Sequence, residues 1–228
     1  MNTSGLTILG TDTEVGKTFV ACRIIESLVR DGVAVGTYKP VASGAPTREQ
    51  SDGFQLWQAS GQRGSLADVT PQSFLASLAP PVAAEMEGKQ VSDDLIVKGA
   101  RNWSGLCEFL VVEGAGGLMS PMSWTMTNAT LALKLAFPVV LVSEDRLGVV
   151  NQVLTSFIAA RSMGLRVCCI VLNAMRDTIE RNKIEPSGNS NERMLRSFIE
   201  KYPDPPAVTR LQRDGMDFIP PVLWQDFG

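Results

Sequence analysis

Apolar residues occur along the chain in short continuous runs that alternate with longer segments of helical periodicity. The continuous runs have strand length and lie at residues 6–9, 33–38, 109–112, 138–143 and 167–172. The helix-length segments lie at residues 17–30, 52–59, 92–104, 127–135, 149–162 and 191–201. Because strands buried on both faces are continuously apolar, this pattern predicts an α/β fold with a mostly parallel sheet covered by helices on both faces.

Two segments, residues 45–51 and 183–190, are rich in polar and turn-forming residues. We interpret them as loops within one domain rather than as linkers between two domains. The sequence contains no internal repeat, heptad pattern or low-complexity tract. It therefore predicts a single domain over residues 1–228.

Charge and residue usage restrict the possible chemistry. The formal net charge is -3 and Lys and Arg are scattered along the chain, so we expect no nucleic-acid partner. The chain has no histidine, which excludes Ser-His-Asp and Cys-His pairs and histidine zinc ligands. The chemistry must therefore use Lys, Asp, Glu, Ser, Thr and backbone amides.

We expect a cytoplasmic protein without a membrane partner. Residues 1–10 lack the basic start and the apolar stretch of a signal peptide, and the apolar runs are too short to cross a bilayer. The four cysteines form no CxxC pair, and Cys168 and Cys169 are adjacent in an apolar run where they behave as small core residues. This usage favours a reducing compartment.

The segment GTDTEVGKT, residues 10–18, separates the first predicted strand from the first predicted helix. Successive backbone N–H groups at a helix start form an anion cradle, and Lys17 adds a positive charge beside the β- and γ-phosphates. Thr18 supplies a hydroxyl for magnesium. The usual GxxxxGK[ST] spacing would place glycine at Thr11 instead of Gly10, so we interpret the segment as a variant phosphate loop.

Two further motifs follow predicted strand ends, where α/β sheets bind ligands. The segment YKPVASG, residues 38–44, presents Lys39 toward a transferring phosphate, although a lysine in this position is more often a solvated strand tip. In VEGAGG, residues 112–117, Glu113 is suited to oppose Thr18 across a metal-bound nucleotide. The glycines after Glu113 allow close approach of the backbone to phosphate or substrate.

These three motifs, in this order and spacing, resemble the dethiobiotin synthetase family, and a weaker resemblance extends the match to roughly residues 1–175. The resemblance implies a P-loop NTPase-like fold and an ATP- and Mg2+-dependent cyclo-ligase. Such an enzyme converts 7,8-diaminopelargonic acid and CO2 to dethiobiotin, ADP and phosphate. The substrate carbamate attacks the γ-phosphate, and the mixed anhydride then closes on the second amine to form the ureido ring.

The resemblance also implies roles for individual residues. Lys17 and Lys39 offset charge on the transferring group. The magnesium ligands are Thr18, Asp52 and Glu113, although Ser51-Asp52 also suits an ordinary helix N-cap and both roles are compatible. The other nucleotide contacts are Thr13, Glu14, Val15, Gly16, Gly114, Ala115, Gly116 and Asn173.

Substrate contacts follow from the same resemblance, which places the site at the interface of a homodimer. Ser43 offers a hydroxyl to the carbamate or the diamine. The helix start of the second subunit, with Gly148, Val149 and Asn151, holds the distant substrate carboxylate, as a helix N-terminus favours. Without the resemblance, Asn151 would be interpreted as a solvated helix residue. The family commonly has an Asn-Asp pair after the strand that ends here at Leu172. This chain has Asn173-Ala174 at that position, so the nucleotide-base preference stays open.

Other protein classes are less compatible with these residues. A partition-type ATPase switch carries an additional lysine early in the phosphate loop, where this chain has Thr11, Asp12 and Thr13. A glutamine-dependent amide synthetase needs a histidine in its glutaminase half. A nucleotide-binding protein with decayed catalytic sites remains an alternative.

Overall fold

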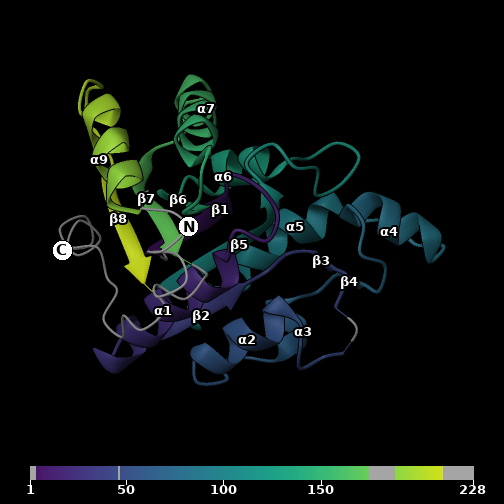
Figure 1. Ribbon diagram of the computed structural model, residues 1–228. Helices are drawn as coiled ribbons and strands as arrows, with labels where there is room; N and C mark the ends of the chain where they lie inside the picture. The colour runs from purple at the N-terminus through teal and green to yellow at the C-terminus, as the bar shows by residue number, and fades with distance from the viewer. Residues whose placement is uncertain (1–3, 46, 175–187, 213–228) are drawn as a thin grey trace.

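A six-stranded sheet forms the centre of the computed structural model, which describes residues 4–45, 47–174 and 188–212 (Figure 1). The strand order is β2-β5-β1-β6-β7-β8, and every neighbouring pair is parallel. The strands are β1 Ser4–Gly10, β2 Val35–Tyr38, β5 Phe109–Gly117, β6 Val139–Glu144, β7 Val167–Ala174 and β8 Ala207–Gln212. The predicted parallel sheet is therefore confirmed.

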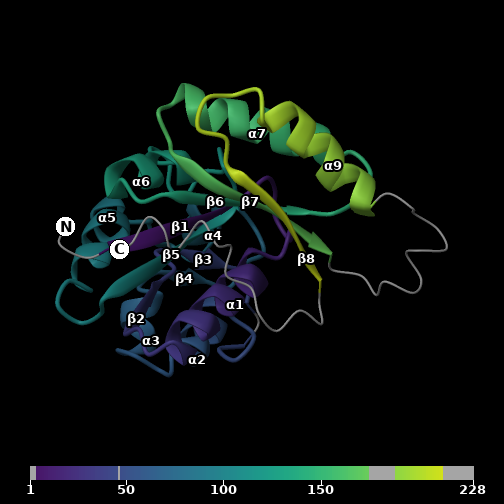
Figure 2. The same cartoon turned by 90° about the vertical axis from the view of Figure 1, so that its left-hand side faces the viewer.

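Helices cover both faces of this sheet, as the apolar pattern predicts. Helices α1 (Lys17–Arg30), α2 (Asp52–Ala59) and α3 (Leu66–Val69) lie on one face, and α7 (Val149–Ser162) and α9 (Gly188–Ile199) lie on the other (Figure 2). The first face is filled by residues such as Ile24 and Val111, and the second by Phe157 and Leu195. Helix α6 (Asn128–Leu135) contributes to both apolar clusters.

A second, two-stranded parallel sheet joins β3 (Ala42–Ser43) to β4 (Ser73–Phe74) and continues into α4 (Pro80–Met86). The sequence pattern predicts none of these three elements, nor α3 and β8. Two-residue strands are too short to show a period, and β8 contains Thr209 and Arg210 within its apolar residues.

Several predicted boundaries are wrong by a few residues. Helix α5 is Asp93–Arg101, shorter than the predicted 92–104. Ser92 is its N-cap, and the helix ends before Trp103, which is buried in the core. Helix α9 begins at Gly188, so residues 188–190 of the predicted loop are helical, and residues 183–187 lie outside the described ranges.

The strand register brings the three sequence motifs to one edge of the sheet. Tyr38 pairs with Val112, so the following residues Lys39 and Glu113 emerge side by side. Ile8 pairs with Glu113 on the opposite side of β5, which places the loop after β1 next to the same carboxylate.

Within the described ranges, no helix has the length and apolar character needed to span a membrane.

Candidate functional site

The loop between β1 and α1 has the backbone geometry of an anion cradle. Glu14 and Gly16 both have positive φ, at 54° and 84°, and Gly16 is the N-cap of α1. No side chain in the described residues caps this helix start, which leaves its N–H groups available to an anion. Lys17 Nζ reaches back over the loop and donates to the Asp12 carbonyl at 3.1 Å.

Gly10 is needed at the start of this loop for steric reasons. A Cβ there would lie 2.6 Å from the Asp12 carbonyl oxygen and 3.1 Å from Lys17 Nζ. The loop therefore folds tightly over a glycine one residue earlier than the usual spacing, which explains the variant motif. Thr13 and Glu14 are exposed, whereas the side chain of Val15 is buried.

Lys39 lies at the centre of a charged cluster. Its Nζ donates to Glu113 Oε1 at 2.5 Å, to Asp52 Oδ2 at 2.7 Å and to the Gly114 carbonyl at 3.1 Å. The Thr18 hydroxyl donates to the same Glu113 oxygen at 2.9 Å. The structure thus brings together the phosphate-loop threonine, the strand-end lysine and the two predicted acidic residues.

Local structure explains how Asp52 joins the cluster. The Ser51 hydroxyl accepts from the Phe54 N–H at 3.2 Å and is the N-cap of α2, so Asp52 is the first residue of that helix. A carboxylate in the first turn is favoured by the helix dipole. Ser51 therefore caps the helix, and the Asp52 carboxylate is available to pair with Lys39.

The cluster shifts the ionisation of its members. Burial opposes the charge on Lys39, but the carboxylates of Glu113 and Asp52 outweigh it and raise the pKa of Lys39 above its usual range. The ammonium of Lys39 in turn lowers the pKa of Asp52. Burial, followed by repulsion from Lys39, lowers the pKa of Lys17 to about 8. Lys39 is thus a fixed cation rather than a proton acceptor.

The oxygen atoms of this cluster fit a hard divalent cation. Thr18, Asp52 and Glu113 offer only oxygen donors, and Glu113 Oε2 is buried with no hydrogen-bond partner among the described residues. In the described ranges, no group of three or more His, Cys, Asp or Glu side chains could hold a metal. Two carboxylates and a hydroxyl nevertheless suit Mg2+, which keeps several waters and binds substrate phosphates.

Asn128 holds the glycine-rich end of β5 and is not predicted as a site residue. The sequence predicts a turn after Glu113, but β5 continues to Gly117. Its Oδ1 accepts from the Ala115 N–H at 2.9 Å, and its Nδ2 donates to the carbonyls of Ala115 and Gly117 at 2.6 and 2.7 Å. The side chain is fully buried. A Cβ on Gly114 would lie 2.5 Å from Asn128 Oδ1, so this close approach requires glycine.

Asn173 links the end of β7 to the phosphate loop. It is buried, and its Nδ2 donates to the Val15 carbonyl at 3.1 Å. The residue predicted to contact the nucleotide base therefore contacts the loop that is predicted to wrap the phosphates.

Among the described residues, none of the predicted substrate residues forms a side-chain hydrogen bond with the charged cluster. Ser43 lies in β3 of the small second sheet, and its hydroxyl donates to the carbonyl of Leu78, between β4 and α4, at 2.7 Å. Gly148, with φ 90°, is the N-cap of α7, and Asn151 is exposed on that helix. The side chain of Val149 is fully buried, which leaves only its backbone for a ligand contact.

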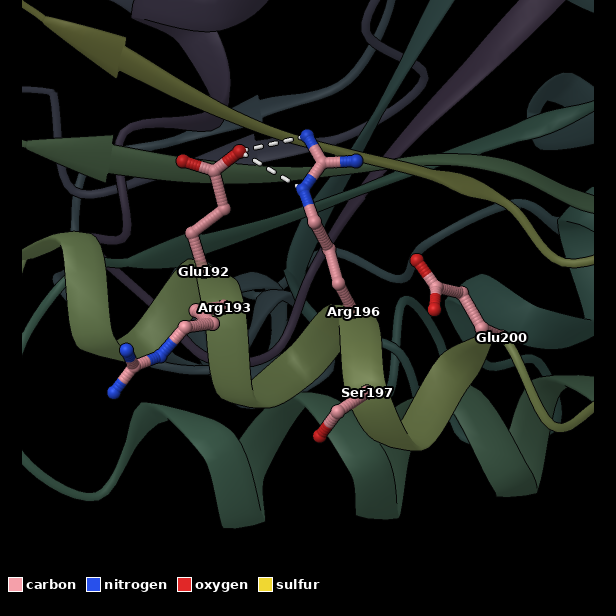
Figure 3. Close-up of a pocket in the computed structure, with 5 residues that line it drawn as sticks. All are labelled: Glu192, Arg193, Arg196, Ser197 and Glu200. Atoms are coloured by element: carbon pink, nitrogen blue, oxygen red, sulfur yellow. Dashed lines mark hydrogen bonds and ion pairs between the residues drawn. The ribbon is translucent and has the colours of Figure 1, made fainter.

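A pocket of about 400 Å³ lies elsewhere, on the surface of α9. Figure 3 shows its lining residues, which are Glu192, Arg193, Arg196, Ser197 and Glu200. Arg196 pairs with Glu192 at 2.7 Å. None of the predicted site residues lines this pocket.

Known proteins resemble this chain in both sequence and fold. The AAA domain family matches residues 4–209. The ATP-dependent dethiobiotin synthetase of Rhodopirellula baltica is 39% identical over 75% of this chain and 72% of its own length. That of Caulobacter sp. is 36% identical over 87% of this chain and 85% of its own length.

The kinase domain of the Escherichia coli tyrosine kinase ETK has a similar fold, with a TM-score of 0.50 and 14% identity, over 78% of this chain and 71% of that domain. At that identity the likeness concerns the fold alone. The names of the sequence relatives agree with the resemblance inferred from the three motifs, and the matches extend over most of the chain. The chain belongs to the family of ATP-dependent dethiobiotin synthetases.

Proposed function

We propose that this chain carboxylates 7,8-diaminopelargonic acid with CO2, phosphorylates the carbamate with ATP and closes the ureido ring to give dethiobiotin, ADP and phosphate. The main supporting observation is the position of Lys39, whose ammonium lies between Glu113 and Asp52 and beside the phosphate-loop residue Thr18. A buried cation next to an anion cradle is suited to stabilise charge on a transferring phosphoryl group.

The residues of the cluster have different roles in phosphoryl transfer. The loop amides and Lys17 bind the phosphates, and Lys39 faces the group in transfer. Thr18, Asp52 and Glu113 would hold Mg2+, which supplies further positive charge to the phosphates when bound. An O–P bond forms between carbamate and γ-phosphorus as the bond to the ADP oxygen breaks. The second amine then forms a C–N bond as the C–O bond to phosphate breaks, and the amine proton passes to the leaving phosphate or to water.

Lys39 acts in this scheme by charge and position. Its pKa is raised by the two carboxylates, so it stays protonated and does not accept the proton of the second amine. Phosphoryl transfer depends on positioning and electrostatic stabilisation more than on a protein nucleophile. A site without histidine is therefore sufficient.

Synthesis of dethiobiotin by the purified protein tests this function. With ATP, Mg2+, bicarbonate and the diamine, we expect dethiobiotin in the mass spectrum and one ADP per product. Without the diamine, ADP release should fall to background. ATP hydrolysis that is independent of the diamine, with no dethiobiotin, would refute the proposal and favour the partition-type ATPase alternative. Complementation of a biotin-requiring bacterial strain that lacks its own synthetase gives an independent test.

We further propose a single-domain, cytoplasmic chain that acts as a homodimer with the substrate between subunits. The face of α7 around Asn151 supports this arrangement, because Leu147 and Ile158 are apolar yet 79% and 50% exposed. Apolar side chains that share a helix face mark interaction surfaces when they are contiguous, and Ile158 follows Asn151 by about two helical turns on one face of α7. None of the four cysteines, all in the described part of the chain, forms a disulfide, which agrees with a reducing compartment.

Mixing two inactive homodimers tests the shared site. Lys39→Ala and Asn151→Ala lie in different subunits of one site in this proposal, so a mixed dimer contains one doubly altered and one intact site. Free exchange makes about half of the dimers mixed, so about a quarter of wild-type activity should return. The control pair is Lys39→Ala with Asp52→Ala, which lie 2.7 Å apart in one chain and should not complement. Confirmed subunit exchange without recovery for Asn151→Ala would exclude the shared site.

A further inference from the structure

Asp145 is a buried carboxylate that has no part in the proposed chemistry. It directly follows β6 and is 1% exposed. Its Oδ2 accepts from Arg210 Nε of β8 at 2.6 Å, and its Oδ1 accepts from Asn191 Nδ2 of α9 at 2.8 Å. Both partners are largely buried, with Arg210 12% exposed at its side chain and Asn191 7% exposed. One carboxylate thus joins three elements at the carboxyl edge of the sheet.

A buried ion pair of this kind is weak support for stability. Desolvation of the two charges offsets most of their attraction, and apolar replacements of similar size are often neutral or stabilising. A buried ion pair that adds little stability can instead serve to fix the position of a functional residue.

Two routes connect Asp145 to the phosphate loop, and both pass through Asn173. The N–H of Asp145 donates to the Asn173 carbonyl at 2.9 Å. Arg210 is adjacent to Leu211, the β8 residue that pairs with Asn173. Asn173 Nδ2 then donates to the Val15 carbonyl at 3.1 Å, within the loop that is proposed to wrap the phosphates.

We propose that Asp145 is a positioning residue for the nucleotide: its contacts with Arg210 and Asn191 fix Asn173, which in turn holds the phosphate loop at Val15. A loop held in its binding conformation before the nucleotide arrives loses less freedom on binding. The proposal rests on nucleotide use by this chain and not on the diamine as substrate. ADP affinity therefore tests it even if no dethiobiotin forms.

The primary measurement is the Kd for ADP with Mg2+, by calorimetry, in Asp145→Asn. We expect a rise of about tenfold, equivalent to about 1.4 kcal/mol. In steady state, the KM for ATP should rise while the KM for the diamine and kcat at saturating ATP stay near wild type. Asp94→Asn is the control, because it breaks an ion pair with Lys98 on α5, away from α9 and β8, and should leave ADP affinity unchanged.

The double variant Asp145→Leu/Arg210→Met separates positioning from stability. It removes both charges, so stability should recover relative to Asp145→Asn, as is common for such replacements. A positioning role predicts that ADP affinity stays weak, whereas a merely structural role predicts that affinity recovers with stability. Asn191→Ala keeps the ion pair and loses the two hydrogen bonds that Asn191 Nδ2 donates to Asp145 Oδ1 and to the Arg146 carbonyl, so it should fold and weaken ADP binding by two- to threefold. Wild-type ADP affinity in the folded Asp145→Asn, double or Asn191→Ala proteins would overturn the proposal.

Discussion

Replacement of Lys39 by alanine should affect stability and turnover through two separable causes. The ammonium lies 2.5 Å from Glu113 Oε1 and 2.7 Å from Asp52 Oδ2, and the residue is 2% exposed. Its removal leaves Glu113, which is fully buried, without its counter-charge. Loss of one partner of a buried pair typically costs about 3–5 kcal/mol in unfolding free energy. Loss of a charge that stabilises the transition state lowers kcat about a hundredfold or more.

A second substitution separates these two effects. If the stability loss comes from the uncompensated carboxylate, then Lys39→Ala/Glu113→Gln should recover most of the unfolding free energy. It should not recover kcat, because the cation remains absent. Lys98→Ala is the matched control, because it breaks a lysine–carboxylate pair on α5 whose side chains are 65% and 76% exposed. That change should leave both stability and turnover nearly unchanged.

Urea unfolding followed by circular dichroism gives the stability, and dethiobiotin formation under saturating substrates gives kcat. A Lys39→Ala protein with wild-type kcat and only a raised KM for ATP would make Lys39 a ground-state binding residue and refute its assigned role. Equal stability of the single and double variants would refute the account of the buried ion pair.

Three further predictions concern other parts of the site and the core. Lys17→Met should lower kcat about a hundredfold, because it removes a charge beside the phosphates, and retained turnover would contradict the phosphate-loop assignment. The unfolding temperature should not fall, because burial and repulsion from Lys39 lower the pKa of Lys17 to about 8 and its charge therefore does not stabilise the fold. Asn128→Ala should lower the unfolding free energy by about 3 kcal/mol in urea titrations, because three backbone groups lose their partner, and a change below 1 kcal/mol would contradict this account. Cys22 is half-buried, and burial raises the pKa of its thiol to about 12, so at pH 8 only about one thiol in 10⁴ is ionised. Iodoacetamide should therefore label Cys22 much faster after unfolding than in the native protein, and equal rates would contradict the raised pKa.

The central part of the cluster could be predicted from the sequence because each motif lies at the carboxyl end of a strand. Lys17, Lys39 and Glu113 are each close in the chain to an apolar run, and the carboxyl ends of parallel strands lie at one edge. The sequence does not determine the order of the strands. That order places β5 between β2 and β1, and it is the reason that Lys39 and Thr18 both reach Glu113.

Residues that act through distant backbone atoms could not be predicted in the same way. Asn128 follows a threonine that suits a helix cap, and its partners are main-chain groups at the glycine-rich end of β5, 11 and 13 residues away. Asp145 follows a strand in a polar segment and resembles a surface acid. Its partners Asn191 and Arg210 are 46 and 65 residues away and meet it only when α9 and β8 pack on the sheet.

Lys39 and the proposed metal site share two carboxylates, so a substitution of either carboxylate affects both the lysine and the metal. Asp52 and Glu113 are proposed magnesium ligands, yet both also hold the Lys39 ammonium in place. Loss of activity in Asp52→Ala therefore combines a weaker metal site with a displaced lysine. Thr18→Ala leaves Lys39 and both carboxylates in the chain, because Thr18 only donates to them: its hydroxyl bonds to Glu113 Oε1 at 2.9 Å and also contributes a hydrogen bond to Asp52. If Thr18 binds magnesium, Thr18→Ala should raise the Mg2+ concentration needed for half-maximal activity, and high Mg2+ should restore kcat. In Asp52→Ala, high Mg2+ should restore only part of kcat, because the position of Lys39 is not recovered.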